Sequence, residues 1–174
     1  MNATRWYVVD ADPRKLDAAR ITLKAGGFEV FVPTQIVRIK PSIRGKRATA
    51  YSWVEKPMFF SFLFCAFDAE TQSWPRRDSR VGIRKLLTFS NGRPAPVEAG
   101  FVERLIQEAP KRLRIPQKGL PAIAVGKQVL IIRGALQGHV ATVLDCNRFQ
   151  AKVEMTIFGG SAEVRLLRSD ITEE

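Results

Sequence analysis

The sequence has little of the chemistry on which most enzymes and metal sites depend. Among its 174 residues there is one histidine, His139, and there are two cysteines, Cys65 and Cys146, with no CxxC pair. It contains no Walker loop, no GxSxG elbow and no cluster of metal-ligand residues. These absences argue against an enzyme, a bound cofactor and a metal site. A cysteine-dependent activity at Cys65 or Cys146 is the weakest alternative.

Patterns typical of membrane segments and export signals are missing as well. The richest apolar run, Met58 to Phe67, has ten residues and includes Ser61, whereas a membrane-spanning helix needs about 20 apolar residues. The N-terminus lacks the basic and then apolar pattern of a signal peptide. Both cysteines stand in apolar contexts typical of buried thiols in a reducing compartment. We therefore expect a cytoplasmic protein.

The positive charge is confined to the first two thirds of the chain. Residues 1–118 contain 22 lysines and arginines against 11 acidic residues, whereas residues 119–174 contain six of each. The whole net charge of +11 therefore belongs to the first part. Such a basic part is typical of a protein that works near a polyanion, usually nucleic acid. A basic surface with no dedicated partner is the alternative.

The N-terminal part alternates strand-like and helix-like patterns without a regular βαβ repeat, which predicts an α+β fold. Asp12 and Pro13 favour a helix start, and Gly26-Gly27 favour its end. The expected elements are a strand at 5–10, a helix from Asp12 to Gly26, an extended segment at 28–39, a basic hairpin arm at 38–56, a strand at 58–67, a short helix at 74–79, an extended segment at 83–89 and a helix after Pro96.

The strand at 59–67 has two apolar faces. Alternation places Phe60, Phe62, Phe64 and Ala66 on one face and Phe59, Ser61, Leu63, Cys65 and Phe67 on the other. Because both faces are apolar, both need cover. Helices can bury one face, and the other must meet a second layer, the C-terminal part or an external partner. Ordinary core packing is the alternative to an interaction site.

The C-terminal part predicts short strands separated by turns. Apolar runs at 129–132, 140–144, 151–157 and 164–167 alternate with glycines and Asn147, as in a small β-barrel. The stretch before it contains two prolines, a glycine and four basic residues, which is typical of a linker. The expected organisation is an N-terminal domain at 1–110, a linker at 111–124 and a C-terminal domain at 125–174.

In this order, the segments resemble the NusG family of transcription elongation factors over nearly the whole chain. The N-terminal resemblance is carried by WYVV at 6–9, VPTQIV at 32–37, KPMFFSFLF at 56–64 and GRPAPV at 92–97. The resemblance to the family's KOW motif is carried by Gly126, Val129, Ile131, GALQG at 134–138, Val143 and Ile157-Phe158-Gly159. The resemblance implies a NusG-type antiparallel sheet with helices, followed by an all-β, SH3-like KOW barrel.

The resemblance also implies a function. Family members bind RNA polymerase through the N-terminal domain and modulate pausing, termination or antitermination. The residues implied for binding the clamp helices of RNA polymerase are Tyr7, Asp10, Phe59, Phe62 and Phe64. The barrel is expected to bind a ribosomal protein or a termination factor through Ile157, Phe158, Gly159, Gly160 and Arg165. The segment KPMFFSFLFCAFD is similar to RfaH-type paralogues, so a general factor and a specialised paralogue both stay open.

Basic residues in two groups are expected to contact the DNA backbone in a transcription complex, since phosphate contacts need cations rather than exact geometry. They are Arg44, Lys46, Arg47, Arg76, Arg77, Arg80, Arg84 and Lys85. Aromatic residues are not interleaved with them, so base stacking is not expected. The alternative function is a ribosome-associated or general nucleic-acid-binding KOW protein. The sequence leaves open whether the barrel covers the phenylalanine-rich strand.

Overall fold

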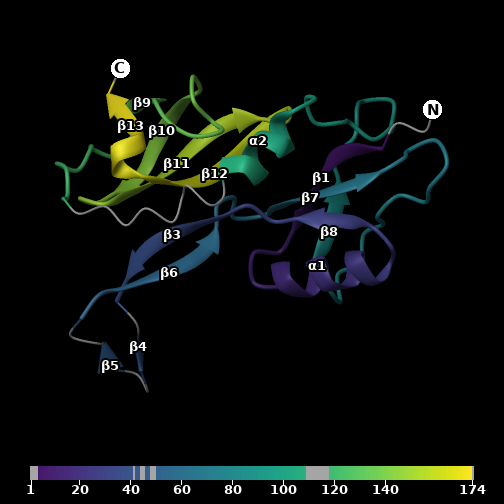
Figure 1. Cartoon of the computed structure of the whole chain (residues 1–174), viewed down its shortest axis with the longest axis horizontal. Helices are drawn as coiled ribbons and strands as arrows, with labels where there is room; N and C mark the ends of the chain where they lie inside the picture. Colours follow the sequence, from purple (N-terminus) through teal and green to yellow (C-terminus); the bar gives the residue numbers. More distant parts are fainter. Residues whose placement is uncertain (1–3, 41, 44–45, 48–49, 109–117, 174) are drawn as a thin grey trace.

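The chain folds mainly into two antiparallel sheets, with one helix beneath the N-terminal sheet and a second helix between the two sheets (Figure 1). The computed structural model describes residues 4–40, 42–43, 46–47, 50–108 and 118–173. One layer, the N-terminal sheet, contains residues of the first half of the chain, and the other, the C-terminal sheet, contains residues 128–173. This is the α+β class that the sequence predicts.

The N-terminal sheet has the strand order β2-β7-β1-β8, and every neighbouring pair is antiparallel. Its strands are β1 (Arg5–Ala11), β2 (Glu29–Phe31), β7 (Phe62–Phe67) and β8 (Ile83–Leu86). Helix α1 (Leu16–Ala25) follows β1, and helix α2 (Phe101–Glu108) follows the loop after β8. Gly27, at a φ of +85°, takes the left-handed conformation that ends α1.

The hairpin arm predicted at 38–56 is confirmed. Strands β3 (Thr34–Ile39) and β6 (Ser52–Pro57) pair along their whole length. The short strands β4 (Ser42–Ile43) and β5 (Lys46–Arg47) continue the arm away from both sheets (Figure 1).

The C-terminal sheet has the strand order β12-β11-β10-β9-β13. Its strands are β9 (Gln128–Ile131), β10 (Val140–Cys146), β11 (Gln150–Ile157), β12 (Gly160–Leu167) and β13 (Ile171–Glu173). The first four correspond to the predicted apolar runs. The sequence analysis missed β13, a three-residue strand that follows a 3-10 turn at Arg168–Asp170.

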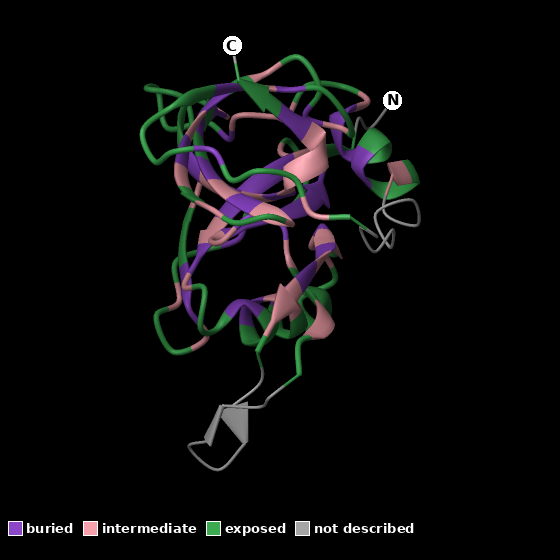
Figure 2. Cartoon of the chain, turned by 90° about the vertical axis from the view of Figure 1, so that its left-hand side faces the viewer, coloured by how far each residue is buried: buried purple, intermediate pink, exposed green. Residues whose placement is uncertain are grey.

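Strand β7 separates two hydrophobic clusters and is buried at all six positions. On one side Leu63, Cys65 and Phe67 pack with Leu16, Ala19 and Leu23 of α1. On the other side Phe62 and Phe64 belong to a cluster that continues into α2 and through the C-terminal sheet. The second apolar face of this strand is therefore covered by the C-terminal sheet, as the buried band between the layers in Figure 2 illustrates.

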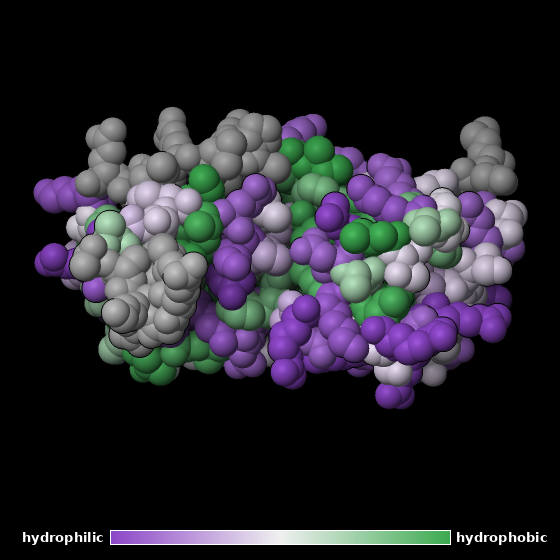
Figure 3. Space-filling view, turned by 90° about the horizontal axis from the view of Figure 1, so that it is seen from below, coloured by the Kyte–Doolittle hydropathy of each residue, from purple (hydrophilic) through white to green (hydrophobic). Residues whose placement is uncertain are grey.

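The outer side of α1 faces solvent. Hydrophilic side chains predominate over this side in Figure 3, consistent with the exposure of Asp17 and Lys24. Ile21 is an exception, since 61% of its surface is exposed. Helix α1 thus covers the sheet with one apolar stripe and presents charge on its other side.

Three local expectations were wrong. Helix α1 begins at Leu16, because the Asp12 carboxylate accepts a hydrogen bond from the backbone N–H of Arg14 (2.9 Å) and forms a turn before the helix. Residues 74–79 contain no helix: Asp78 instead exchanges two backbone hydrogen bonds with Ile83. Phe59 lies on the same side as Phe62 and Phe64, because the chain bends between residues 59 and 61 and breaks the alternation.

Candidate protein-binding face

Three of the predicted binding residues form one aromatic group, which we call the phenylalanine face: Phe59, Phe62 and Phe64. The ring centroids of Phe59 and Phe64 are 5.9 Å apart, and those of Phe59 and Phe62 are 6.4 Å apart. All three side chains are buried, with exposed fractions of 1%, 8% and 0%. A face of this size would form a large apolar patch if it were uncovered.

The tip of the C-terminal sheet covers the phenylalanine face. Phe158, in the turn between β11 and β12, lies 6.2 Å from Phe59, 6.2 Å from Phe62 and 5.7 Å from Phe64 between ring centroids. Phe101 of α2 completes the group, 5.3 Å from Phe158 with the two rings nearly perpendicular. Phe158 adopts a positive φ of 56°, a conformation that is uncommon for a residue other than glycine. The backbone of the turn thus directs this ring into the N-terminal part.

Backbone hydrogen bonds join the two sheets beside this aromatic group. Phe59 and Val164 form an isolated antiparallel bridge. The backbone N–H of Phe60 donates to the carbonyl of Glu163 (3.3 Å), and that of Arg165 donates to the carbonyl of Met58 (2.9 Å). Strand β12 is an end strand of its sheet, so these bonds satisfy part of its outer edge.

Arg165 adds a charged contact to the same junction. Its guanidinium lies 3.6 Å from the centre of the Phe60 ring, and its Nη1 donates to the carbonyl of Pro57 at 3.0 Å. Burial lowers the pKa of Arg165 from its usual value, against the opposing effect of Glu163. Glu163 in turn pairs with Lys152 at 2.7 Å. The junction therefore combines aromatic packing with polar groups that water can also satisfy.

A second contact joins the C-terminal sheet to the arm. The Gln150 side chain accepts a hydrogen bond from the backbone N–H of Arg38 (3.1 Å) and donates one to its carbonyl (3.2 Å). The Arg38 guanidinium lies 4.2 Å from the centre of the Phe149 ring and 4.0 Å from that of Tyr51. Trp53 packs edge-on against Phe149. The sequence analysis missed these residues, since no local pattern relates positions 112 residues apart.

Of the other two predicted polymerase-binding residues, Asp10 lies beside the phenylalanine face and Tyr7 does not. Asp10 lies opposite Phe62 in the register of β1 and β7, and its carboxylate is 3.7 Å from the Arg84 guanidinium. Tyr7 belongs to the cluster on the α1 side, where its ring stacks on Phe67 at 4.2 Å. Burial raises the pKa of the Tyr7 hydroxyl. Tyr7 is therefore separated from the phenylalanine face by the sheet itself.

The residues predicted to bind a second partner lie at the junction between the sheets. Ile157 is buried, Phe158 and Arg165 contact the N-terminal part, and Gly159 and Gly160 are exposed at the tip. The two predicted binding surfaces thus cover each other.

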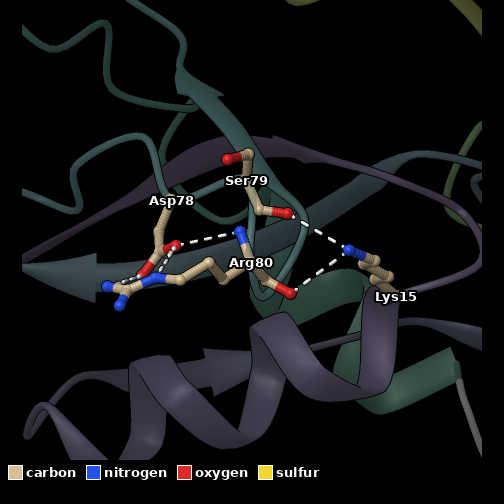
Figure 4. Close-up of polar contacts among 4 residues, drawn as sticks. All are labelled: Lys15, Asp78, Ser79 and Arg80. Carbon is tan, nitrogen blue, oxygen red and sulfur yellow. Dashed lines mark hydrogen bonds and ion pairs between the residues drawn. The ribbon is translucent and has the colours of Figure 1, made fainter.

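The predicted basic residues after β7 lie at 76–85, in the loop and turn before β8 and in the first residues of β8, a segment that we call the basic turn (Figure 4). Asp78 accepts hydrogen bonds from the Arg80 guanidinium (3.3 Å) and from its backbone N–H (3.0 Å). The side-chain bond from Arg80 is the main cause that lowers the pKa of Asp78. Lys15 donates to the carbonyls of Ser79 and Arg80, both at 3.2 Å. These contacts hold the turn against the start of α1.

Gly82 allows the close approach of this turn to Lys15. A Cβ atom at position 82 would lie 2.6 Å from the Cβ of Lys15, and the φ of +84° favours glycine. The side chains of Arg76, Arg77, Arg80, Arg84 and Lys85 are exposed. Of the basic residues predicted in the arm, Arg44 and the side chains of Lys46 and Arg47 lie outside the described residues.

The described residues contain no group of three or more His, Cys, Asp and Glu side chains able to hold a metal ion. In the same part of the chain, no helix is long and apolar enough to cross a membrane. His139 lies in a turn, where its Nδ1 is 3.0 Å from the carbonyl of Leu136.

Residues 118–124 pack against the C-terminal sheet. Ile123 is buried in its core, and the backbone N–H of Leu120 donates to the carbonyl of Arg148 (2.8 Å). The Arg168 side chain donates to the carbonyl of Pro121 (2.7 Å). The second half of the segment expected to be a linker is thus part of the C-terminal layer, and residues 111–117 lie outside the described residues.

Comparison with known proteins gives one family match and likenesses to solved structures. Residues 4–106 match the family model described as "Transcription termination factor nusG". Among curated proteins there is no match. A solved structure of Thermotoga maritima NusG, titled "Domain interaction in Thermotoga maritima NusG", is similar at 18% identity, over 98% of this chain and 97% of that one, with a TM-score of 0.47.

A crystal structure titled "MjSpt4:Spt5 complex conformation B" is similar at 11% identity, over 97% of this chain and 95% of that one, with a TM-score of 0.26. Both TM-scores lie below 0.5, so neither likeness fixes the fold of this chain. The family match rests on residues 4–106, which include the phenylalanine face and the basic turn.

Proposed function

Because this chain belongs to the NusG family of transcription factors, we propose that it binds RNA polymerase through the phenylalanine face and modulates pausing, termination or antitermination. The observation that carries this proposal is the convergence of Phe59, Phe62 and Phe64 into one aromatic face. The cover of that face comes from α2 and from the distant C-terminal sheet rather than from α1. Aromatic anchors of this kind supply much of the energy of protein interfaces.

The described arrangement is, in this proposal, a closed form. Phe158 occupies the face that a polymerase helix would need. Binding therefore requires that the C-terminal sheet moves away, and the apparent affinity is reduced by the fraction of molecules that are closed. Asp10, beside Phe62, lies at the edge of this interface, whereas Tyr7 supports the sheet from its other side.

The C-terminal sheet would be the family's KOW barrel, and residues 125–174 a separate domain joined to an N-terminal domain at 1–110. Displacement from the phenylalanine face would expose Ile157, Phe158 and Arg165 for a second protein partner, a ribosomal protein or a termination factor. Since one movement exposes both surfaces, polymerase and the second partner would each favour binding of the other.

The basic turn would contact the DNA backbone near the polymerase. Its arginines are exposed, and Asp78 and Lys15 hold the backbone of the turn in place. Such phosphate contacts would weaken as the salt concentration rises. A ribosome-associated protein would use the same cations, but this alternative gives no role to the phenylalanine face.

The experiment that tests the proposal measures retention of the full chain on immobilised core RNA polymerase, together with pausing and terminator read-through in a purified transcription reaction. We expect retention and a change in read-through for the wild-type chain, and stronger retention for Phe158→Ala. Retention on ribosomes or on RNA, but not on polymerase in either variant, would show the proposal to be wrong.

A further inference from the structure

A groove of about 520 Å³ opens on the N-terminal part, and none of the residues of the phenylalanine face lines it. The groove is formed by β1, by the loop that follows β7 and by the loop that follows β8. Three aromatic side chains line it, Tyr7, Trp74 and Phe89, together with the cations Arg5 and Arg93. Its volume falls in the range typical of ligand sites, roughly 300–1,000 Å³.

Two of these aromatic rings are exposed although hydrogen bonds hold them in place. Trp74 is 39% exposed and Phe89 is 55% exposed. The Trp74 indole N–H donates to the carbonyl of Ala69 (2.9 Å), which fixes the ring relative to the loop. The backbone of Phe89 donates to the carbonyl of Arg93 and accepts from Gly92, both at 2.9 Å. Both rings are thus held in place and presented to solvent.

The charge around the groove is positive. Arg5 and Arg93 are exposed, and Glu70 is the acidic residue among the described lining residues. Two residues beyond Trp74 the basic turn begins, with Arg76 and Arg77 exposed. Exposed flat rings next to cations are the combination that binds single-stranded nucleic acid, because bases stack on the rings while phosphates pair with the cations.

We propose that this groove binds a nucleobase of single-stranded nucleic acid by stacking on Trp74 and Phe89, with Arg5 and Arg93 contacting the neighbouring phosphates. In the sequence, no aromatic residues are interleaved with the basic groups. In the fold, two separate loops bring Trp74 and Phe89 to one groove. An acidic peptide fits less well, since it would pair with the arginines and leave both rings exposed to water.

The inference goes beyond the proposed contacts of the basic turn, which involve only the DNA backbone, and it rests on the proposal that nucleic acid lies beside that turn. It does not depend on the phenylalanine face. The groove is open while the C-terminal sheet covers that face, so the full chain as described here is competent to bind.

The test compares two labelled probes on the full chain by fluorescence anisotropy at low salt: a short oligothymidylate, and an abasic oligomer of equal length that keeps the phosphates but has no bases. We expect tighter binding of the oligothymidylate. Phe89→Ala and Trp74→Ala should each weaken it roughly 5- to 150-fold, the range for loss of one stacked base, and leave binding of the abasic oligomer unchanged. Arg93→Ala should weaken both probes.

Two controls keep the result specific. Ile21→Ala removes an apolar side chain outside the groove that is at least as exposed and should change binding of neither probe. Trp74→Phe keeps a ring and should retain most of the affinity, which separates loss of stacking from misfolding. Equal affinity for the two probes, no binding of oligothymidylate, full affinity in both alanine variants, or displacement of the probe by polyglutamate as readily as by unlabelled oligothymidylate would each overturn the inference.

The same variants distinguish this inference from the proposed function. Phe89→Ala should be retained on core RNA polymerase like the wild-type chain. The variant should therefore lose its preference for oligothymidylate over the abasic oligomer while its retention on polymerase stays intact. A wild-type chain that binds oligothymidylate but not polymerase would contradict the proposed function and leave the groove in place.

Discussion

The two faces of the N-terminal sheet are covered in different ways, although a single strand, β7, contributes to both. On one face α1, which follows β1 directly, covers Leu63, Cys65 and Phe67 with aliphatic side chains. On the other face the cover of Phe62 and Phe64 is the C-terminal sheet, about 100 residues farther along the chain. The first cover is local and apolar, whereas the second combines the Phe158 ring with Arg165 and two backbone hydrogen bonds.

This difference indicates which cover is removable. Burial of aliphatic side chains under α1 is lost only when the N-terminal part itself unfolds. The polar contacts of the C-terminal cover exchange for water at little net cost, since one hydrogen bond contributes only about 0.5–1.5 kcal/mol. The aromatic contacts of Phe158 therefore carry most of the cost of opening. We therefore regard the α1 face as permanent core and the phenylalanine face as a binding surface that is covered in the closed form.

The largest effect is expected from Leu63→Ala, on the permanent face. Leu63 is fully buried, so the loss of its side chain should lower the free energy of unfolding by about 2–5 kcal/mol, measured by urea denaturation. Polymerase retention by the remaining folded protein should not increase. A gain in retention would break the distinction between the two faces.

Cys65 gives this prediction a second readout. Burial raises the pKa of its thiol to about 12, so almost no thiolate is present at neutral pH and labelling requires local opening. Leu63→Ala should accelerate the labelling of Cys65. Because the thiol of the unfolded chain ionises near its ordinary value of 9.0, the free energy of unfolding should also fall as the pH rises from about 9 towards 12.

A smaller loss of stability, combined with a gain of binding, is expected from Phe158→Ala. The variant loses ring contacts with Phe59, Phe62, Phe64 and Phe101, which should weaken the closed form by about 1–3 kcal/mol, since Phe158 is only half-buried. The apparent affinity for polymerase should rise by the factor that corresponds to this change in free energy. Cys65 labelling should stay at the wild-type rate; faster labelling would mean that both faces open together.

Arg165→Ala should have the next effect in size. It removes the guanidinium over Phe60 and the hydrogen bond to the Pro57 carbonyl, worth together about 1–2 kcal/mol at a partly buried site. Polymerase retention should increase about tenfold, and Arg165→Lys should give part of this increase, because lysine keeps the charge but not the planar group. Unchanged retention in Arg165→Ala would assign the closure to aromatic packing alone.

The smallest effect is expected from Lys152→Ala. Lys152 pairs with Glu163 at 2.7 Å and lies 4.6 Å from the centre of the Phe60 ring, but its side chain is one-third exposed. Partly exposed pairs of this kind contribute about 0–1 kcal/mol. The increase in polymerase retention should be less than for Arg165→Ala and should disappear at high salt.

Sequence reasoning predicted the elements better than it predicted their contacts. The apolar run that contains β7 and the glycine-separated runs of the C-terminal part are local, so β7 and four of the five C-terminal strands were predicted, and β13 was too short to detect. Two predictions of elements were wrong, the start of α1 and the helix at 74–79, and both have local causes that residue spacing does not reveal. The Asp12 side chain forms a turn, and Asp78 pairs with the backbone of Ile83 in place of a helix.

The candidate site depended on long-range packing. Apolarity on both faces of β7 predicted that both needed cover, but it did not distinguish a partner from the C-terminal part. That outcome depends on how Phe158 and Arg165 meet Phe62 and Phe60 across about 100 residues. Tyr7 was assigned to the phenylalanine face by resemblance, yet in the register of β1 its side chain points to the α1 side.

A disulfide between the two sheets tests the central claim most directly. Phe60 and Glu163 lie opposite each other beside the Phe59–Val164 bridge, at a spacing that suits a disulfide between antiparallel strands. The variant Phe60→Cys/Glu163→Cys, made with Cys146→Ser, would be compared with each single replacement. We predict that the oxidised chain is not retained on core RNA polymerase and that reduction restores retention. Equal retention of the oxidised and reduced chains would contradict the account.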